Sequence, residues 1–371
     1  MSLLTFSDIS FWTAITAYSL TVLATFGHLA WKTKNWQRVS AICAGSGLTA
    51  HLLSLGAIAL ALERAPWGSL YEFLSAVSAL LMIVTVSQVL PKPELTSITG
   101  VLTGVAVMLM GIGALLYAEP TDLQPALQSG WLAIHVFLAI VGSGSLLSAA
   151  TVSFLYLRRL RYDEQTQKNL TDRRADSPIT TATASAIPSE APAFTASVPD
   201  HTFHRSLVTE GNASSVLLSR SLSAAAGKEA GTALLEKNQR DTIDPTKENT
   251  DNKQHTKEAV NAHKTRLPSA KRLDTLAHRL VTFSFPIWTL AVLMGAVWGE
   301  QAWGRYWGWD PKETMSFIIW VLFAGYLHAR ATRGWKGKRS AVLACWGGGA
   351  ILFNFLFVNL VISGLHSYSG L

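Results

Sequence analysis

The feature that most constrains this chain is a series of apolar runs about 20 residues long, the length that a helix needs to cross a bilayer. Only helices and closed barrels satisfy every backbone polar group inside lipid, and runs of this length favour helices. Charged residues make up 15% of the chain, against about 25% in soluble domains. The sequence therefore predicts an all-α, polytopic membrane protein. The eight expected spans are Ile9–Ala30, Val39–Leu62, Leu70–Leu90, Ile98–Tyr117, Trp131–Leu157, Leu276–Trp298, Met315–Ala331 and Ala341–Ser363.

Lys and Arg are unevenly divided between the two ends of these spans, and basic residues gather on the cytoplasmic side of membrane proteins. The opposite ends carry mostly Asp and Glu, with only Arg64, Arg305 and Lys312 as basic residues. Both termini and the segment 297–314 are then extracytoplasmic. This topology explains the basic loops without a nucleic-acid partner. The basic side comprises Lys32, Lys34, Arg38, Lys92, Arg279, Arg330, Arg333, Lys336, Lys338 and Arg339.

The stretch 158–274 is hydrophilic and almost free of aromatic residues, so it cannot bury enough apolar surface to fold. We expect residues 1–157 to form five transmembrane helices, 158–274 a disordered cytoplasmic insert, and 275–371 three further helices. The N-terminal segment lacks a basic region before its apolar run, so we expect a retained span and no cleaved signal. Cys43 and Cys345 form no Cys-x-x-Cys pair, which excludes a thiol–disulfide motif.

Four of the 13 Trp residues lie within the segment 297–314. They are Trp298, Trp303, Trp307 and Trp309, interleaved with Gly and followed by Asp310 and Pro311. So much Gly disfavours a helix, and we expect a loop or interfacial platform. An ordinary aromatic belt at the membrane boundary is the alternative. The density of Trp favours a surface for a flat aromatic ligand.

Two histidines are expected on the same membrane side as this segment. His135 lies near the extracytoplasmic end of the fifth span, and His366 follows the eighth. Imidazole is a strong ligand for iron, so the pair above a Trp shelf indicates a bis-histidine haem site. Either histidine alone would more simply make a structural hydrogen bond. Arg305 and Lys312 are candidates to pair with the haem propionates.

His328 is expected near the cytoplasmic end of the seventh span, too far from the Trp-rich segment to join that site. It could hydrogen-bond within the bundle or ligate a second haem, with His28, His51 or another protein supplying the partner. For His28 and His51 we favour hydrogen bonds between packed helices. His278 is most simply an interfacial residue. Asp310 could instead cap the seventh span, with Glu313 favoured by the helix dipole.

The segment from Trp298 to Thr314 resembles the Trp-rich signature of the haem-handling WWD-domain family, and most closely its CcsA-type cytochrome c biogenesis members (system II). Trp131 with His135, Leu327-His328, and the stretch 363–368 support the resemblance. It covers about residues 70–157 and 273–371. The insert 158–274 is not a core feature of that family.

The resemblance implies that His135 and His366 ligate the iron of reduced haem b beneath a loop carrying Trp298, Trp303, Trp307, Trp309 and Asp310. It implies that His328 holds haem within the membrane, together with a CcsB-type membrane partner. The implied activity is haem delivery to apocytochromes c, as part of a haem-lyase (synthase) complex with no dedicated catalytic residue in this chain. Similarity to cyanobacterial and plastid members implies the thylakoid membrane, with the Trp-rich loop on the lumenal side; a bacterial plasma membrane is the alternative.

Three other functions remain open from the residues. A haem exporter would carry haem without promoting its attachment. A b-type electron-transfer protein would exchange electrons with a quinone or carrier, and cytochrome maturation would survive its loss. A structural membrane subunit would bind no haem and would be colourless when purified.

Overall fold

The computed structural model describes residues 2–31, 33–117, 128–176 and 267–362, and contains helices and no strand within these ranges. Among the described residues, eight helical segments are long and apolar enough to span a membrane, which confirms the predicted all-α, multi-pass architecture. The elements are α1 Leu3–Trp31, α2 Lys34–Ala61, α3 Leu70–Val84 with η1 Thr85–Val89, η2 Pro93–Ile98 with α4 Thr99–Leu115, α5 Gly130–Asp176, α7 Ala270–Trp303, α8 Pro311–Thr332, and α9 Lys338–Phe353 with η4 Asn354–Val358 and α10 Asn359–Val361.

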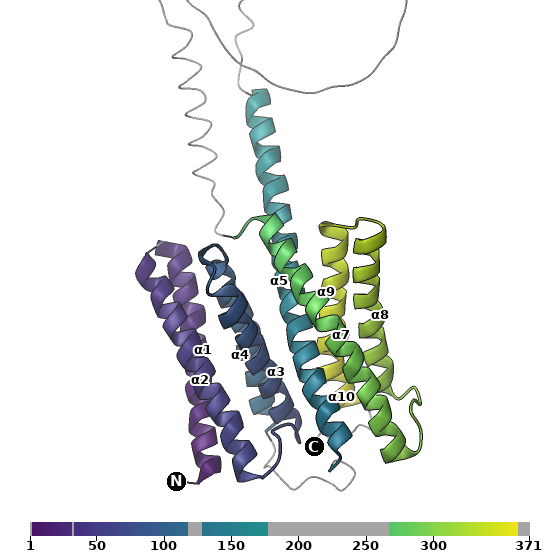
Figure 1. Cartoon of the computed structure of the whole chain (residues 1–371). Helices are drawn as coiled ribbons and strands as arrows, with labels where there is room; N and C mark the ends of the chain where they lie inside the picture. The colour runs from purple at the N-terminus through teal and green to yellow at the C-terminus, as the bar shows by residue number, and fades with distance from the viewer. Residues whose placement is uncertain (1, 32, 118–127, 177–266, 363–371) are drawn as a thin grey trace, which may run out of the picture. The chain divides into compact units, whose positions relative to one another are not determined.

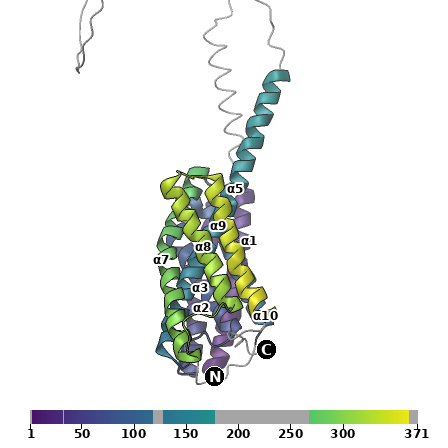
Figure 2. The same ribbon diagram turned by 90° about the vertical axis from the view of Figure 1, so that its right-hand side faces the viewer.

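The helices run alternately up and down, so their connections gather at two ends (Figure 1). The turn between α1 and α2 and the turn between α8 and α9 lie at one end, here called the basic end. The N-terminus and the α7–α8 connection, residues 304–310, lie at the other end, here called the Trp end. A view turned by 90° shows the same separation (Figure 2). The segments that charge assigns to a common side therefore share one end of the bundle.

Large apolar side chains face outward along the helices. Leu23 is 65% exposed, Leu60 71% and Phe283 61%. Water would penalise such surfaces, but lipid tails are as apolar as these side chains. Helices approach closely where side chains are small: a Cβ on Gly142 of α5 would lie 3.2 Å from the backbone of Trp288 in α7. The bundle is thus built for lipid outside and for tight packing inside.

The predicted role of His51 in hydrogen bonds between packed helices is supported by its contacts, whereas the contact of His28 is local to one turn. His51 is fully buried, with Nε2 2.9 Å from Ser75 Oγ and Nδ1 3.3 Å from Tyr18 Oη. These contacts tie α2 to α3 and α1. His28 Nδ1 lies 3.0 Å from the carbonyl of Thr33 in the α1–α2 turn.

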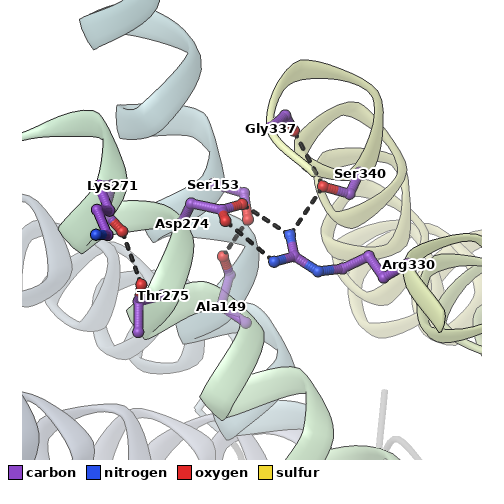
Figure 3. A network of polar contacts seen from close by, with 8 residues as sticks. All are labelled: Ala149, Ser153, Lys271, Asp274, Thr275, Arg330, Gly337 and Ser340. Atoms are coloured by element: carbon purple, nitrogen blue, oxygen red, sulfur yellow. Dashed lines mark hydrogen bonds and ion pairs between the residues drawn. The ribbon is translucent and has the colours of Figure 1, made fainter. Parts of the chain in front are cut away.

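An ion pair joins α7, α8 and α9 at the basic end (Figure 3). Arg330 donates to both carboxylate oxygens of Asp274, at 2.7 and 3.0 Å, and to Ser340 Oγ at 3.1 Å. Ser340 Oγ in turn donates to the Gly337 carbonyl at 3.0 Å. Three helices that contribute to the Trp end are therefore fixed at their other end.

We expect Arg330→Met to lower the unfolding free energy by about 3 kcal/mol, because it leaves the Asp274 carboxylate without its charged partner in a largely buried place. Thermal unfolding in detergent measures the effect. Lys338→Met, an exposed basic residue at the same end, serves as the control. Equal melting temperatures for the two variants would contradict a structural role for the pair.

The helices around the predicted insert extend beyond the expected boundaries. α5 continues to Asp176, and α7 begins at Ala270. Residues at both edges of 158–274 are therefore helical, and Arg159, well inside α5, donates to the carbonyl of Leu267 just before α7 at 2.7 Å. The rest of the insert, 177–266, lies outside the described residues.

Candidate functional site

The Trp-rich segment is only partly a loop, which corrects the prediction for 297–314. α7 continues through Trp303 and ends at Gly304, which adopts a left-handed φ of 68° and donates its N–H to the Glu300 carbonyl at 2.8 Å. A left-handed Gly is a common helix end. Gly299 remains helical because packing overrides its low propensity: a Cβ there would lie 3.3 Å from the Arg305 carbonyl. The non-helical part is confined to residues 304–310.

The four Trp side chains form two edge-to-face pairs rather than one flat shelf. The rings of Trp298 and Trp303 are 4.8 Å apart at 67°, and those of Trp307 and Trp309 are 5.7 Å apart at 88°. Trp298 is buried, whereas Trp309 is 65% exposed. Trp309 also contacts Phe317 at 6.0 Å. Each pair therefore has an inner ring, Trp298 or Trp307, that lines a cavity.

Asp310 begins α8 as its N-cap, which confirms the capping interpretation of this residue. Asp310 and Glu313 form a capping box, in which each side chain satisfies a backbone N–H at the start of the helix. Glu313 Oε2 accepts from the N–H groups of Asp310 at 3.1 Å and Gly308 at 2.8 Å. Glu313 thus holds the chain on both sides of Trp309, whose φ of 57° is unusual for a residue other than Gly.

We expect Glu313→Ala to release the 304–310 connection, because two backbone donors lose their acceptor. The cost should be about 1–2 kcal/mol in unfolding free energy, with faster proteolysis of this connection in detergent. Glu300→Ala, an exposed residue at the end of α7, is the matched control. Identical proteolysis of both variants would show that Glu313 does not fix the connection.

His135 lies in the second turn of α5 and faces α7. Its Nδ1 is 2.7 Å from the Ala291 carbonyl. A carbonyl only accepts hydrogen bonds, so in the neutral ring Nδ1 carries the proton and Nε2 carries the lone pair. This is how histidines are oriented when they bind a metal. The ring approaches so closely because position 295 is Gly: a Cβ there would lie 2.7 Å from both Cε1 and Nδ1.

A cavity of about 210 Å³ adjoins His135. Its walls come from the α2–α3 turn, α3, α5, α7, the Trp-rich segment, α8, η4 and α10. Much of the lining is apolar or aromatic, and the polar groups include His135, Lys312, Glu313 and Asn354. Such a surface, apolar with a few placed polar groups, is typical of ligand sites.

Asn354 is the first residue of the π-helix η4, a type of distortion that occurs frequently at functional sites. It is 5% exposed, and its Oδ1 is buried without a hydrogen-bond partner. A buried polar atom left unpaired costs about 1–3 kcal/mol. The cavity wall therefore carries a polar group that packing alone does not explain.

The other predicted site residues have different positions. Lys312 lines the cavity, and the Arg305 guanidinium lies against Gly308 on the exposed connection.

The remaining histidines lie elsewhere. His328 is exposed on α8, one turn before the helix ends at Thr332. His278 faces Tyr326, with ring centroids 6.1 Å apart. His366 lies outside the described residues. Within the described ranges no three His, Cys, Asp or Glu side chains are grouped as metal ligands.

Sequence reasoning missed several residues that shape the cavity. No sequence motif marks Trp67 or Gly295 as a residue that lines the cavity, because their position there depends on how distant helices pack. Asn354 and the Arg64–Glu72 pair did offer a signal, because polar and charged residues within or beside a span are costly and mark functional positions.

Comparisons with known proteins give a consistent result. The model of the family described as Cytochrome C assembly protein matches residues 39–366. The Cytochrome c biogenesis protein CcsA of Synechocystis sp. is 33% identical over 258 residues, which cover 67% of this chain and 64% of that protein. This chain therefore spans less than two thirds of the Synechocystis relative. The protein of the same name from Rippkaea orientalis is 32% identical over 310 residues, covering 82% of this chain and 80% of the relative.

Among solved structures, the chain named Cytochrome c Heme Lyase CcmF aligns with a TM-score of 0.53 at 15% identity, covering 96% of this chain and 50% of the other. At this identity the likeness concerns the fold. The family match includes the spans that carry His135, the Trp-rich segment and Asn354. Because the family model matches residues 39–366, the chain belongs to the cytochrome c assembly protein family.

Proposed function

We propose that this protein receives reduced haem b as its substrate and presents it at the Trp end for attachment to apocytochromes c. The observation that carries the proposal is His135, whose Nδ1–H is held by the Ala291 carbonyl so that Nε2 is the metal-binding nitrogen, beside an aromatic cavity. The relatives named cytochrome c biogenesis protein support the same role. His366 is the proposed second axial ligand.

In this proposal Trp298 and Trp307 contact the macrocycle from the cavity, and Trp303 and Trp309 support them from behind. Asp310 acts through the cap that sets the connection. Lys312, which lines the cavity, pairs with a propionate, and Arg305 on the exposed connection pairs with the other.

Attachment adds the S–H of an apocytochrome cysteine across a haem vinyl group. The sulfur forms the thioether bond with one vinyl carbon, and a proton is added to the other, with no net oxidation. The protein contributes by holding haem and thiol in reacting geometry, which is where most of the rate effect arises. None of its side chains is assigned as a general base. The incoming histidine of the apocytochrome displaces an axial ligand and releases the product.

His328 suits a separate, earlier haem site. It is an exposed histidine on a helix that spans the membrane, and polar groups facing lipid are costly unless they are covered. We propose that a CcsB-type partner covers this face and supplies the second ligand there. We further propose the thylakoid membrane, with the Trp end in the lumen, because the CcsA relatives from Synechocystis sp. and Rippkaea orientalis are cyanobacterial.

Loss of c-type cytochrome maturation in cells tests the function. Cells expressing His135→Ala or His366→Ala as the only copy are expected to lack covalent haem in their cytochromes c, while His28→Ala supports wild-type levels. Haem-stained gels give the readout, with immunoblots showing equal amounts of each variant. Wild-type maturation in both site variants would overturn the proposal. A haem exporter is distinguished because it would not be isolated together with an apocytochrome.

A further inference from the structure

The cavity beside His135 has a wall that comes from a different part of the chain. Trp67, Gly68 and Ser69 belong to the turn between α2 and α3, and all three line the same cavity as His135 and Trp298. Trp67 is half-buried and packs against the core. The N-terminal helices therefore contribute an aromatic side chain to the site, outside the Trp-rich segment.

The turn is held by one buried carboxylate. Glu72 is fully buried, and its two oxygens accept from the Arg64 guanidinium at 2.8 and 3.0 Å. The same carboxylate accepts the Gly68 N–H at 2.6 Å. Ser69 caps the start of α3 by accepting from the Glu72 N–H at 3.2 Å. Both ends of the Ala65–Gly68 segment, including Trp67, are thereby fixed.

The Arg64–Glu72 ion pair fixes the path of the turn more than it adds to the unfolding free energy. Removing two charges from water offsets much of their attraction, and an apolar pair of similar volume is often at least as stable. A bidentate contact, by contrast, fixes direction as well as distance. Arg64 also donates to the Ala65 carbonyl at 3.1 Å, so the pair sets the path of the turn just before Trp67.

We propose that Trp67 is a haem-contacting residue and that the Arg64–Glu72 pair is the element that positions it. This inference rests on the proposed function, because it takes the cavity beside His135 as the haem site. The indole of Trp67 presents a flat, rigid, apolar surface, and stacking on such a surface suits a macrocycle. Haem is then enclosed by aromatic side chains from both the N-terminal and C-terminal helices.

The rate at which haem leaves the full-length protein tests this proposal. Protein purified with reduced haem is mixed with excess apomyoglobin under anaerobic conditions, and haem capture is followed by absorbance. We expect Trp67→Leu to accelerate haem loss about tenfold, which corresponds to about 1.4 kcal/mol, and Trp67→Phe to give a smaller change. Trp12→Leu, at a 59% exposed position of α1, is the matched control and should leave the rate unchanged.

The positioning role of the ion pair is tested by a double-mutant cycle. Glu72→Gln should accelerate haem loss on its own, but should add little in a protein that already carries Trp67→Leu. Asp163→Asn, which breaks the more exposed Arg159–Asp163 pair on α5, should change nothing. Full additivity of the two site variants would overturn the positioning role. If the Glu72→Gln variant does not fold, the haem-loss rates of Trp67→Leu and Trp12→Leu still test whether Trp67 contacts haem.

The outcomes separate this inference from the proposed function. If His135→Gly retains haem as firmly as the wild type, the haem lies elsewhere and the proposed function itself fails. If His135→Gly loses haem but Trp67→Leu releases it at the wild-type rate, the Trp67 contact is overturned and the proposed function stands.

Discussion

His135→Gly is expected to remove the sharp visible bands of reduced, low-spin haem from the purified protein, and added imidazole is expected to restore them. The Nδ1–H of His135 is held by the Ala291 carbonyl at 2.7 Å, so the ring is already oriented to offer Nε2 to iron. The His135→Gly substitution removes the imidazole ring and leaves a cavity of the same size, in which free imidazole can bind. Absorption spectra of the reduced protein, recorded with and without imidazole, measure the effect.

His28→Gly is the control for this experiment, because His28 contacts the Thr33 carbonyl in a turn at the basic end and has no predicted haem role at the Trp end. Its spectrum should match the wild type. An unchanged spectrum in His135→Gly would move the haem away from this cavity, and His328→Gly would then be the variant to compare. A colourless wild type would favour the structural-subunit alternative.

Gly295→Ala should be nearly as damaging, although it removes nothing that contacts haem. The added Cβ would lie 2.7 Å from His135 Cε1 and Nδ1, well inside van der Waals contact, so the ring must move and lose its bond to Ala291. A displacement of about 1 Å in a reacting site commonly lowers the rate on the order of 100-fold. We expect a loss of that size in haem attachment, measured with purified components.

The helix itself should tolerate this substitution, because Ala favours helices over Gly by about 0.5–1 kcal/mol. Gly111→Ala in α4 provides the matched control, since a Cβ there meets nothing within 4 Å. It should fold, bind haem and support attachment as the wild type does. Equal activity of the two variants would show that the close approach of α7 to His135 is not required.

The sequence predicts the eight spans well, because apolar length reports directly on the lipid environment, but it ends α5 too early and begins α7 too late. The roles of some single residues are predictable as well. His51 is polar and lies in a span, so it is expected to hydrogen-bond within the bundle, and its ring nitrogens contact Tyr18 and Ser75. Asp310 was likewise recognisable as a cap, since Pro311 and Glu313 follow it in the expected pattern.

The Trp-rich segment shows where sequence reasoning stops. Counting Gly residues predicts a loop from 297, but Gly299 and the turn after Trp298 stay helical because the Arg305 backbone packs against them. The expected flat shelf is replaced by two edge-to-face Trp pairs. Local composition predicts an aromatic surface, whereas tertiary contacts decide which rings face the cavity.

The cavity itself could not have been predicted. Trp67 and Phe355 lie far apart in the chain and line one space only because their helices pack around α5 and α7. Periodicity within each span carries no information about that packing. Pairing of His135 with His366 remains a prediction, since His366 lies outside the described residues.

The most direct measurement is covalent transfer of haem by the purified protein. Full-length protein with the proposed CcsB-type partner, loaded with reduced haem b, would be incubated anaerobically with an apocytochrome c carrying Cys-x-x-Cys-His. The account predicts haem-stained apocytochrome and the spectrum of a thioether-linked haem, both lost with His135→Gly. Haem that stays non-covalent with the wild type, while the protein exchanges electrons rapidly with a quinol, would contradict the account and identify a b-type electron carrier instead.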